Sequence, residues 1–100
     1  MIKLYLCGKI TDTSRELEKA NLRKFFEVEN ELRDRGFDVC NPAKFETDGK
    51  PWEWYLAHDL KFIYENRPMI YLMEGWRESR GARLEVEFAK LCGLQIISSL

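Results

Sequence analysis

The stretch IKLYLCG at residues 2–8 decides the fold, because it is a short apolar run that a glycine ends. A run of this kind near the start of a chain is typical of a buried β-strand. Similar runs follow as FDVCNP at residues 37–42, PMIYLM at 68–73 and LQIISSL at 94–100. We therefore predict four short strands, the first over residues 2–7.

The first interval between these runs has a helical pattern. A helix is expected to begin near Ser14, because Thr13 and Glu16 have capping-box spacing, and to end at Gly36, which would form a left-handed cap. The apolar stripe that this helix would bury consists of Leu17, Phe25, Val28 and Leu32.

Two further helices are expected. One runs from Trp52 to about residue 65 after Pro51, and the other covers residues 82–92 and is closed by Gly93. The apolar side of the former consists of Trp52, Tyr55, Leu56, Leu60 and Ile63. The preceding residues 43–51 are rich in turn formers and predict a loop, with Asp48 and Gly49 at its tip.

Strands and helices thus alternate along the whole chain, which predicts the α/β class. We expect residues 1–100 to form a single Rossmann-like or flavodoxin-like three-layer domain. Its sheet would have four or five parallel strands with the first strand central and helices on both faces. In such sheets ligands bind beyond the carboxyl ends of the strands.

Composition limits the classes of function. Sixteen basic and seventeen acidic residues give a net charge of −1, so no broad field attracts nucleic acid or an anionic membrane. A leader peptide or membrane span is not expected, because no long apolar run occurs. The three cysteines form no metal-type pair and are expected to be buried thiols. These features predict a cytoplasmic protein that needs no metal.

Candidate site residues follow the first and third strands. Gly8 follows the first strand, and Tyr5 lies two residues before Cys7 on the same face. Ser79 and Gly81 stand where the last helix begins, where free N–H groups favour a phosphate. Glycine in a turn and tyrosine in a core are equally ordinary, so both interpretations stay open for Gly8 and Tyr5.

Two carboxyl groups add a chemical possibility. Glu85 lies about one turn into the last helix, whose dipole is expected to keep it ionised, as a nucleophile or as a plain helix-stabilising residue. Asp59 lies four residues after Tyr55 on an otherwise apolar face, which would raise its pKa as a proton donor requires, unless it faces solvent. Trp52 and Trp54 either line a pocket for a base or pack the loop.

Several segments together resemble a known family. They are YLCGK at 5–9, NP at 41–42, WEWYLAHDL at 52–60 and GARLE at 81–85 followed by Ala89. The chain is similar to short bacterial and phage proteins that belong with the nucleoside 2-deoxyribosyltransferases and the deoxynucleoside 5′-monophosphate N-glycosidases. The resemblance covers nearly the whole chain, and its strongest part is the pattern G-x-x-x-E-x-x-x-A.

The resemblance implies roles for individual residues. Glu85 would be the nucleophile that attacks C1′ of the sugar, Tyr5 would orient it, and Asp59 would handle the proton of the departing base. Ser79 would contact a 5′-phosphate, with Gly8, Lys9, Arg80 and Gly81 as further substrate- or phosphate-binding residues.

The expected function is therefore cleavage or transfer at the N-glycosidic bond of a nucleoside or nucleoside 5′-monophosphate, without a cofactor. The alternatives are a non-catalytic nucleotide-binding or nucleotide-sensing module with the same pocket and, by analogy of fold alone, a glycosidase acting on dinucleotides. Related enzymes complete their crevice from a neighbouring subunit, so a homodimer is also expected.

Overall fold

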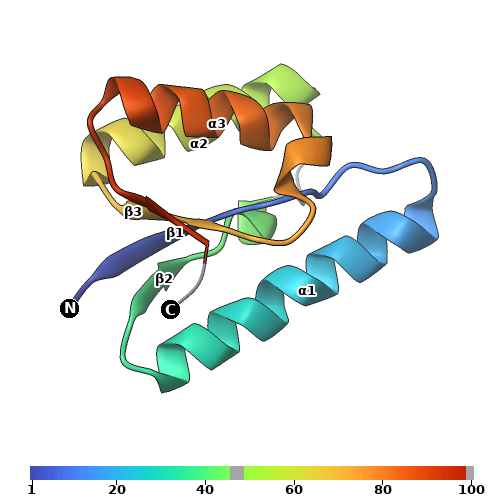
Figure 1. The fold of residues 1–100 in the computed structure, drawn as a ribbon. Coiled ribbons are helices and arrows are strands. Elements are labelled where there is room, and N and C mark those ends of the chain that lie inside the picture. The colour runs from blue at the N-terminus through green and yellow to red at the C-terminus, as the bar shows by residue number, and fades with distance from the viewer. Residues whose placement is uncertain (46–48, 99–100) are drawn as a thin grey trace.

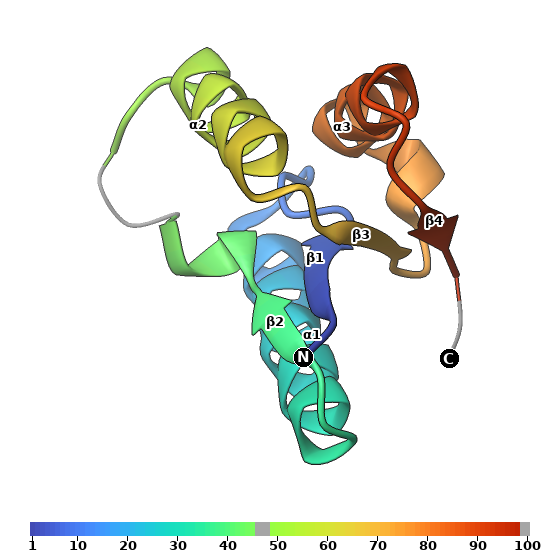
Figure 2. The same ribbon diagram turned by 90° about the vertical axis from the view of Figure 1, so that its left-hand side faces the viewer.

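One parallel sheet forms the centre of the molecule. In this computed structural model, which describes residues 1–45 and 49–98, its strands are β1 (Lys3–Cys7), β2 (Asp38–Cys40), β3 (Met69–Leu72) and β4 (Ile96–Ile97). The strands lie in the order β2-β1-β3-β4 and all neighbours are parallel (Figures 1 and 2). The first strand is therefore an interior strand, as predicted.

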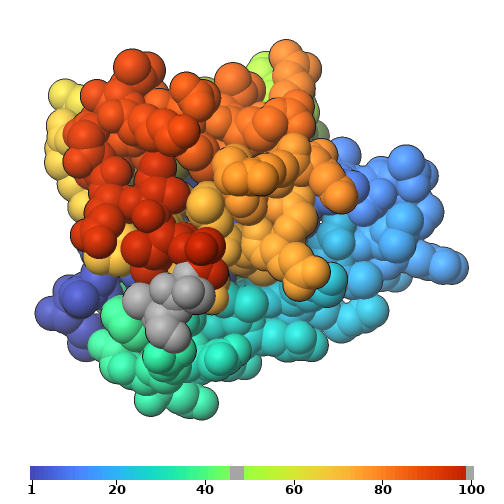
Figure 3. Space-filling view, in the orientation of Figure 1, coloured from blue at the N-terminus to red at the C-terminus, as the bar shows by residue number. Residues whose placement is uncertain are grey.

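Helices cover both faces of this sheet. Helix α1 (Arg15–Asp34) lies on one face, and α2 (Trp52–Asn66) and α3 (Arg80–Leu91) lie side by side on the other (Figures 1 and 2). In the face shown in Figure 3, α3 and its flanking segments cover the upper part of the molecule and α1 the lower part. The three-layer α/β prediction is confirmed. No helix in the described ranges is both long and apolar enough to cross a membrane.

The alternation of β1 divides the core into two clusters. Leu4 and Leu6 pack with Phe25 and Leu32 of α1. Tyr5 and Cys7 point to the opposite face and pack in the cluster that α2 and α3 cover, with Ile63, Ile70, Ala82, Val86 and Ala89. Successive strand residues face opposite sides, so this division places Tyr5 and Cys7 together under α3.

Helix α1 begins and ends where expected, with one correction inside it. Ser14 is the N-cap and its Oγ accepts a hydrogen bond from the Leu17 N–H at 3.1 Å, so the cap lies one residue later than the Thr13–Glu16 spacing implies. Gly36 follows the helix with φ of 93°. Leu17 is wrongly assigned to the buried stripe, because this first-turn side chain is 48% exposed.

The other boundaries differ by a few residues. Helix α3 begins at Arg80 rather than at residue 82, since Ser79 caps it, and Gly93 ends it with φ of 73°. The predicted loop over 43–51 contains part of a short 3₁₀ helix, η1 (Pro42–Phe45). A second one, η2 (Trp76–Glu78), precedes α3. Asp48, expected at the loop tip, lies outside the described residues.

A buried carboxylate fixes the connection from β2 to η1. Glu29 of α1 is 4% exposed and accepts hydrogen bonds from Arg33 Nε and Lys44 Nζ, each at 2.8 Å, and from Asn41 Nδ2 at 3.1 Å. Asn41 in turn accepts from the Ala43 N–H at 2.9 Å. Burial alone would raise the pKa of Glu29, but the bonds from Lys44, Arg33 and Asn41 outweigh it and lower the pKa.

Glu29→Gln should therefore destabilise the fold by about 1–2 kcal/mol at neutral pH, because Lys44 and Arg33 lose the charge of Glu29 while the amide oxygen still accepts from Asn41. Both cations are partly exposed, which keeps the loss moderate. The folded pKa of Glu29 lies below its unfolded value, so its contribution is present near neutral pH and disappears as the pH falls through the folded pKa. Urea unfolding at pH 7 and pH 3 measures this: the difference between the two proteins should shrink at pH 3.

Candidate functional site

A narrow cleft opens at the carboxyl ends of β1 and β3. The segment after β1 leads to α1 on one face of the sheet and the segment after β3 leads to α3 on the other face, so the two segments diverge and leave a crevice between them. Among the residues that line the cleft are Gly8, Trp52, Asp59, Ser79, Gly81 and Glu85. They come from the segment after β1, from α2 and from the start of α3. The cleft has a volume of about 50 Å³.

Glu85 is the most enclosed charged group of the cleft. It lies in the second turn of α3 and is 6% exposed. The Tyr5 hydroxyl donates a hydrogen bond to Glu85 Oε2 at 2.6 Å, and Cys7 Sγ lies 3.5 Å from Oε1. Burial and the charge of Glu85 raise the pKa of Tyr5 well above its ordinary range, so this hydroxyl remains a donor. Two residues of β1, Tyr5 and Cys7, therefore contact the two oxygens of the Glu85 carboxyl group.

The second carboxyl group of the cleft, Asp59 of α2, interacts electrostatically with Glu85. Burial, and secondly the negative charge of Asp59, raise the pKa of Glu85 to about 8, while the bond from Tyr5 acts in the opposite direction. Burial also raises the pKa of Asp59, and His58 Nδ1, 3.4 Å from Asp59 Oδ1, opposes this shift. The expectation that the helix dipole keeps Glu85 ionised is wrong in this respect, because burial outweighs the dipole.

The two carboxyl groups share one cleft and influence each other's protonation. The charge of Asp59 disfavours the ionisation of Glu85, so the two groups lose their protons in separate steps. With its pKa of about 8, Glu85 is largely protonated near neutral pH. Two carboxyl groups that share one proton can offer a nucleophile and a proton donor at once when that proton lies on the second group, which is the arrangement that cleavage of a glycosidic bond uses.

The start of α3 provides anion-binding groups at the same cleft. Ser79 is the N-cap of α3, and its Oγ accepts a hydrogen bond from the Ala82 N–H at 3.1 Å. Within the described residues, the N–H groups of Arg80 and Gly81 have no acceptor. The Arg80 guanidinium does not line the cleft but stacks over the Trp52 ring, 4.7 Å from its centroid. One wall of the cleft thus has the N–H groups at the start of α3, and the Arg80 guanidinium lies outside the cleft against the Trp52 ring.

Gly8 lines the cleft, and its lack of a side chain has a packing reason. A Cβ atom there would lie 3.1 Å from Met73 Cβ and 3.2 Å from Phe25 Cζ, which is closer than ordinary contact. A larger residue at this position would require the Met73 or Phe25 side chain to shift.

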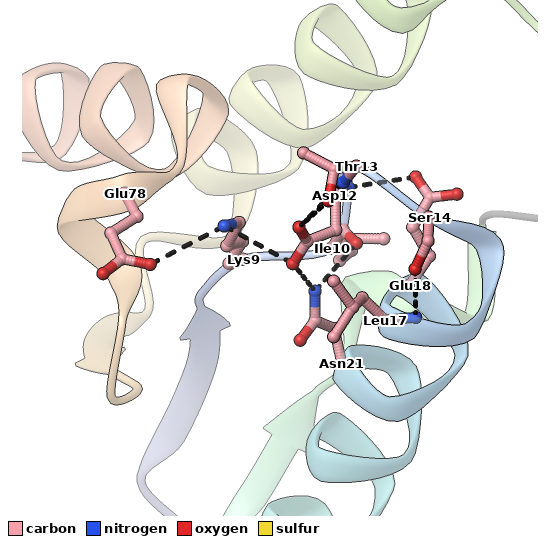
Figure 4. A network of polar contacts seen from close by, with 9 residues as sticks. All are labelled: Lys9, Ile10, Asp12, Thr13, Ser14, Leu17, Glu18, Asn21 and Glu78. Atoms are coloured by element: carbon pink, nitrogen blue, oxygen red, sulfur yellow. Dashed lines mark hydrogen bonds and ion pairs between the residues drawn. The ribbon is translucent and has the colours of Figure 1, made fainter.

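Lys9 lies apart from these groups. Its Nζ is 3.4 Å from Asp12 Oδ2 and 3.6 Å from Glu78 Oε2, and Asp12 also accepts a hydrogen bond from Asn21 Nδ2 (Figure 4). Lys9 is absent from the lining of the cleft. Through these ion pairs it connects the segment after β1 to η2.

A family model described as "Domain of unknown function (DUF4406)" matches residues 2–98, which is nearly the whole chain. The chain belongs to the DUF4406 family. No curated protein matches it. Since the family's description names no reaction, the chemistry of this DUF4406 chain has to be argued from its own residues.

The structure of this DUF4406 domain brings most of the predicted site residues together. Five of them line the cleft: Gly8, Asp59, Ser79, Gly81 and Glu85. Tyr5 lies directly behind Glu85, whereas Lys9 and Arg80 lie outside the lining. Two contacts were not anticipated from the sequence, Cys7 against Glu85 and His58 against Asp59. The described residues hold no cluster of three or more His, Cys, Asp or Glu that could bind a metal ion.

Proposed function

We propose that this chain cleaves, or transfers across, the N-glycosidic bond of a nucleoside or nucleoside 5′-monophosphate, and that it is related to the nucleoside 2-deoxyribosyltransferases and the corresponding N-glycosidases. The observation that carries the proposal is the Glu85–Asp59 pair, which faces one cleft with the Tyr5 hydroxyl 2.6 Å from Glu85. Glu85 carries a proton near neutral pH, and bond cleavage with a basic leaving group requires that proton on Asp59.

In the first step Glu85 acts as the nucleophile after its proton has passed to Asp59, because its raised pKa leaves it protonated near neutral pH. A carboxylate oxygen forms a bond to C1′ as the bond between C1′ and the base nitrogen breaks, and the electron pair of that bond goes to the base. Asp59 gives its proton to the base, which leaves neutral. Tyr5 donates to the other oxygen of Glu85 and favours the ionised form that must attack.

In the second step the acceptor releases the sugar. Water, or a second base in a transferase, attacks C1′, and the bond to Glu85 breaks with its electrons returning to the carboxylate. Asp59, now ionised, takes the proton of the acceptor, so the pair regains one proton and one charge. Hydrolysis thus converts one nucleoside and one water into a free base and a free sugar.

Substrate binding requires the cleft to widen. Its volume of about 50 Å³ lies well below the roughly 300 Å³ at which ligand pockets begin. We expect the first turn of α2 to move, because Trp52 in this turn is 37% exposed. If Trp52 moved outward, Tyr55 of the same helix would still line the cleft. A moved Trp52 would also offer its ring for stacking on the base.

The direct test is release of free base from a panel of nucleosides and 5′-monophosphates in the ribo and 2-deoxyribo series, followed by chromatography. A second base added in excess distinguishes transfer from hydrolysis. We expect at least one member of the panel to be turned over. Tight binding of a panel member without release of base would contradict the enzymatic proposal.

Such a result would favour the second candidate, a non-catalytic nucleotide-binding or nucleotide-sensing module. The observation on its side is the pKa of Glu85, raised by burial to about 8, since a carboxyl group protonated near neutral pH binds a ligand without attacking it.

Ser79→Ala should weaken the binding of monophosphates by roughly tenfold while nucleosides are affected little, because the hydroxyl and the free N–H groups of Arg80 and Gly81 form the proposed phosphate site. The measurement is KM, or Kd in an inactive background, for a nucleoside and its 5′-monophosphate. Equal losses for both ligands would contradict the phosphate assignment.

The matched control is Ser14→Ala. Ser14 caps α1 as Ser79 caps α3, with the same 3.1 Å bond to a backbone N–H, but it does not line the cleft. Both variants should lose about 1 kcal/mol of stability from the missing cap. Only Ser79→Ala should discriminate against the phosphate.

We further propose that the chain acts in the cytoplasm as a homodimer in which a second copy completes the cleft. In support, Leu84 and Leu91 lie seven residues apart on α3 and are 40% and 85% exposed, an apolar pair that a partner would cover. The three cysteines of the chain are unpaired, as in reducing compartments. Sedimentation at working concentration tests the dimer, and a monomer under assay conditions would contradict it.

A further inference from the structure

A buried thiol in the site has no part in the mechanism described so far. Cys7 is fully buried, on the same face of β1 as Tyr5. Its Sγ lies 3.5 Å from Glu85 Oε1 and 3.4 Å from the carbonyl oxygen of Ala82. The Tyr5 hydroxyl takes the other carboxylate oxygen, Oε2. Tyr5 and Cys7 thus offer each oxygen of Glu85 a hydrogen-bond donor from β1.

The thiol has one proton and two acceptors, so only one of the two bonds exists at a time. The Ala82 carbonyl is neutral and belongs to the hydrogen-bonded backbone of α3. A carboxylate oxygen is a much stronger acceptor once it is charged. The thiol proton should therefore point to Glu85 when Glu85 is ionised, and to Ala82 when Glu85 is protonated.

The thiol itself stays protonated in both states. Burial, and after it the charge of Glu85, raise the pKa of Cys7 far above its ordinary range. A thiol that is neutral and closed to solvent is neither a nucleophile nor a redox centre. What it can do in this position is donate a hydrogen bond.

The other titratable groups around Glu85 cannot replace this donor. Tyr5 of β1 already donates to Oε2, and Asp59 of α2 opposes ionisation through its charge. His58 contacts Asp59 rather than Glu85. Cys7 is therefore the second group, after Tyr5, whose hydrogen bond favours the charged form of Glu85.

We propose that Cys7 is a positioning residue for Glu85: its thiol proton turns from the Ala82 carbonyl to Glu85 Oε1 when Glu85 becomes ionised, and with Tyr5 it fixes the orientation of the carboxylate towards the cleft. The turning of the thiol depends on the Glu85 charge alone. Its consequence for catalysis rests on the proposed function.

The S–H stretching band in the infrared reports this change directly, because few other protein groups absorb there. In Cys40→Ala/Cys92→Ala protein, Cys7 is the only thiol. As the pH rises through the titration of Glu85, the band should shift to lower frequency, which marks a stronger hydrogen bond. The same protein carrying Glu85→Gln should show no shift. A band that does not move in the Glu85-containing protein would overturn the proposal.

Substitutions at Cys7 give a second measurement that does not need the other cysteines changed. Cys7→Ala removes the donor, and Cys7→Ser keeps one. The titration of the Glu85 carboxyl carbon, followed by ¹³C NMR, should move to higher pH by roughly half a unit to one unit in Cys7→Ala and stay near or below the native value in Cys7→Ser. Equal titration in all three proteins would overturn the proposal.

Activity, once found, separates this inference from the proposed function. Cys7→Ala should lower kcat by roughly three- to tenfold with little change in KM, and Cys7→Ser should restore it. If the band and the titration respond but no base is ever released, the proposed function fails while the positioning of Glu85 stands. If base is released but neither responds to Glu85, the role of Cys7 fails alone.

Discussion

Glu85→Gln should lower kcat for base release by roughly three to six orders of magnitude, with KM changed far less. Glutamine keeps the shape of the side chain and still accepts the hydrogen bond from Tyr5, but it cannot form the bond to C1′. Loss of a nucleophile removes the reaction path itself, whereas loss of a binding contact costs about one or two orders of magnitude. Single-turnover kinetics on the best substrate of the panel provide the measurement.

The chain offers a matched control two residues further along the same helix. Glu87 is exposed and does not line the cleft, and among the described residues it pairs only with Lys90, at 3.7 Å, so Glu87→Gln should leave kcat unchanged. Asp59→Asn should behave differently from both. It should slow substrates with poor leaving bases more than substrates with good ones, because protonation matters less for a base that leaves easily. Near-normal turnover by Glu85→Gln would rule out the covalent mechanism.

The fold was predictable because its signals are local in the sequence. The apolar run over residues 2–7 and the glycines at 36 and 93 mark strand and helix ends through backbone preferences that need no tertiary context. The alternation of strands and helices predicted parallel strands with the first one central, and the order β2-β1-β3-β4 agrees with this. Leu17 was wrongly assigned to the buried stripe of α1, because helical spacing shows which face of a helix is apolar but not how far the sheet extends beneath it.

The candidate site was predictable in its membership but not in its electrostatics. Sheet topology brings Glu85 and Asp59 to one cleft, and the family resemblance had singled out both where spacing alone left their roles open. The raised pKa of Glu85 depends on burial and on the distance between two helices, which no local pattern encodes. The contact of Cys7 with Glu85 could have been found, since Tyr5 and Cys7 share a face of β1, but a cysteine in an apolar run usually only fills space.

The same buried carboxyl group should weaken the fold as the pH rises. The folded pKa of Glu85, about 8, lies above its ordinary value of 4.5, so the native state binds more protons than the unfolded state between these values. Stability should therefore fall as the pH rises through this window.

Glu85→Gln removes this dependence. Relative to the native protein it should be about equally stable near pH 4 and more stable by roughly 2–4 kcal/mol near pH 9, with Tm raised by roughly 10 °C or more. Calorimetry or urea unfolding at the two pH values measures the difference, with Glu87→Gln as a control that should show no such trend. A Glu85→Gln protein less stable than the native one at pH 9 would contradict the burial argument. A gain in stability together with a loss of activity is the outcome that the proposed function predicts, because a carboxyl group buried for chemistry destabilises the fold when it is charged.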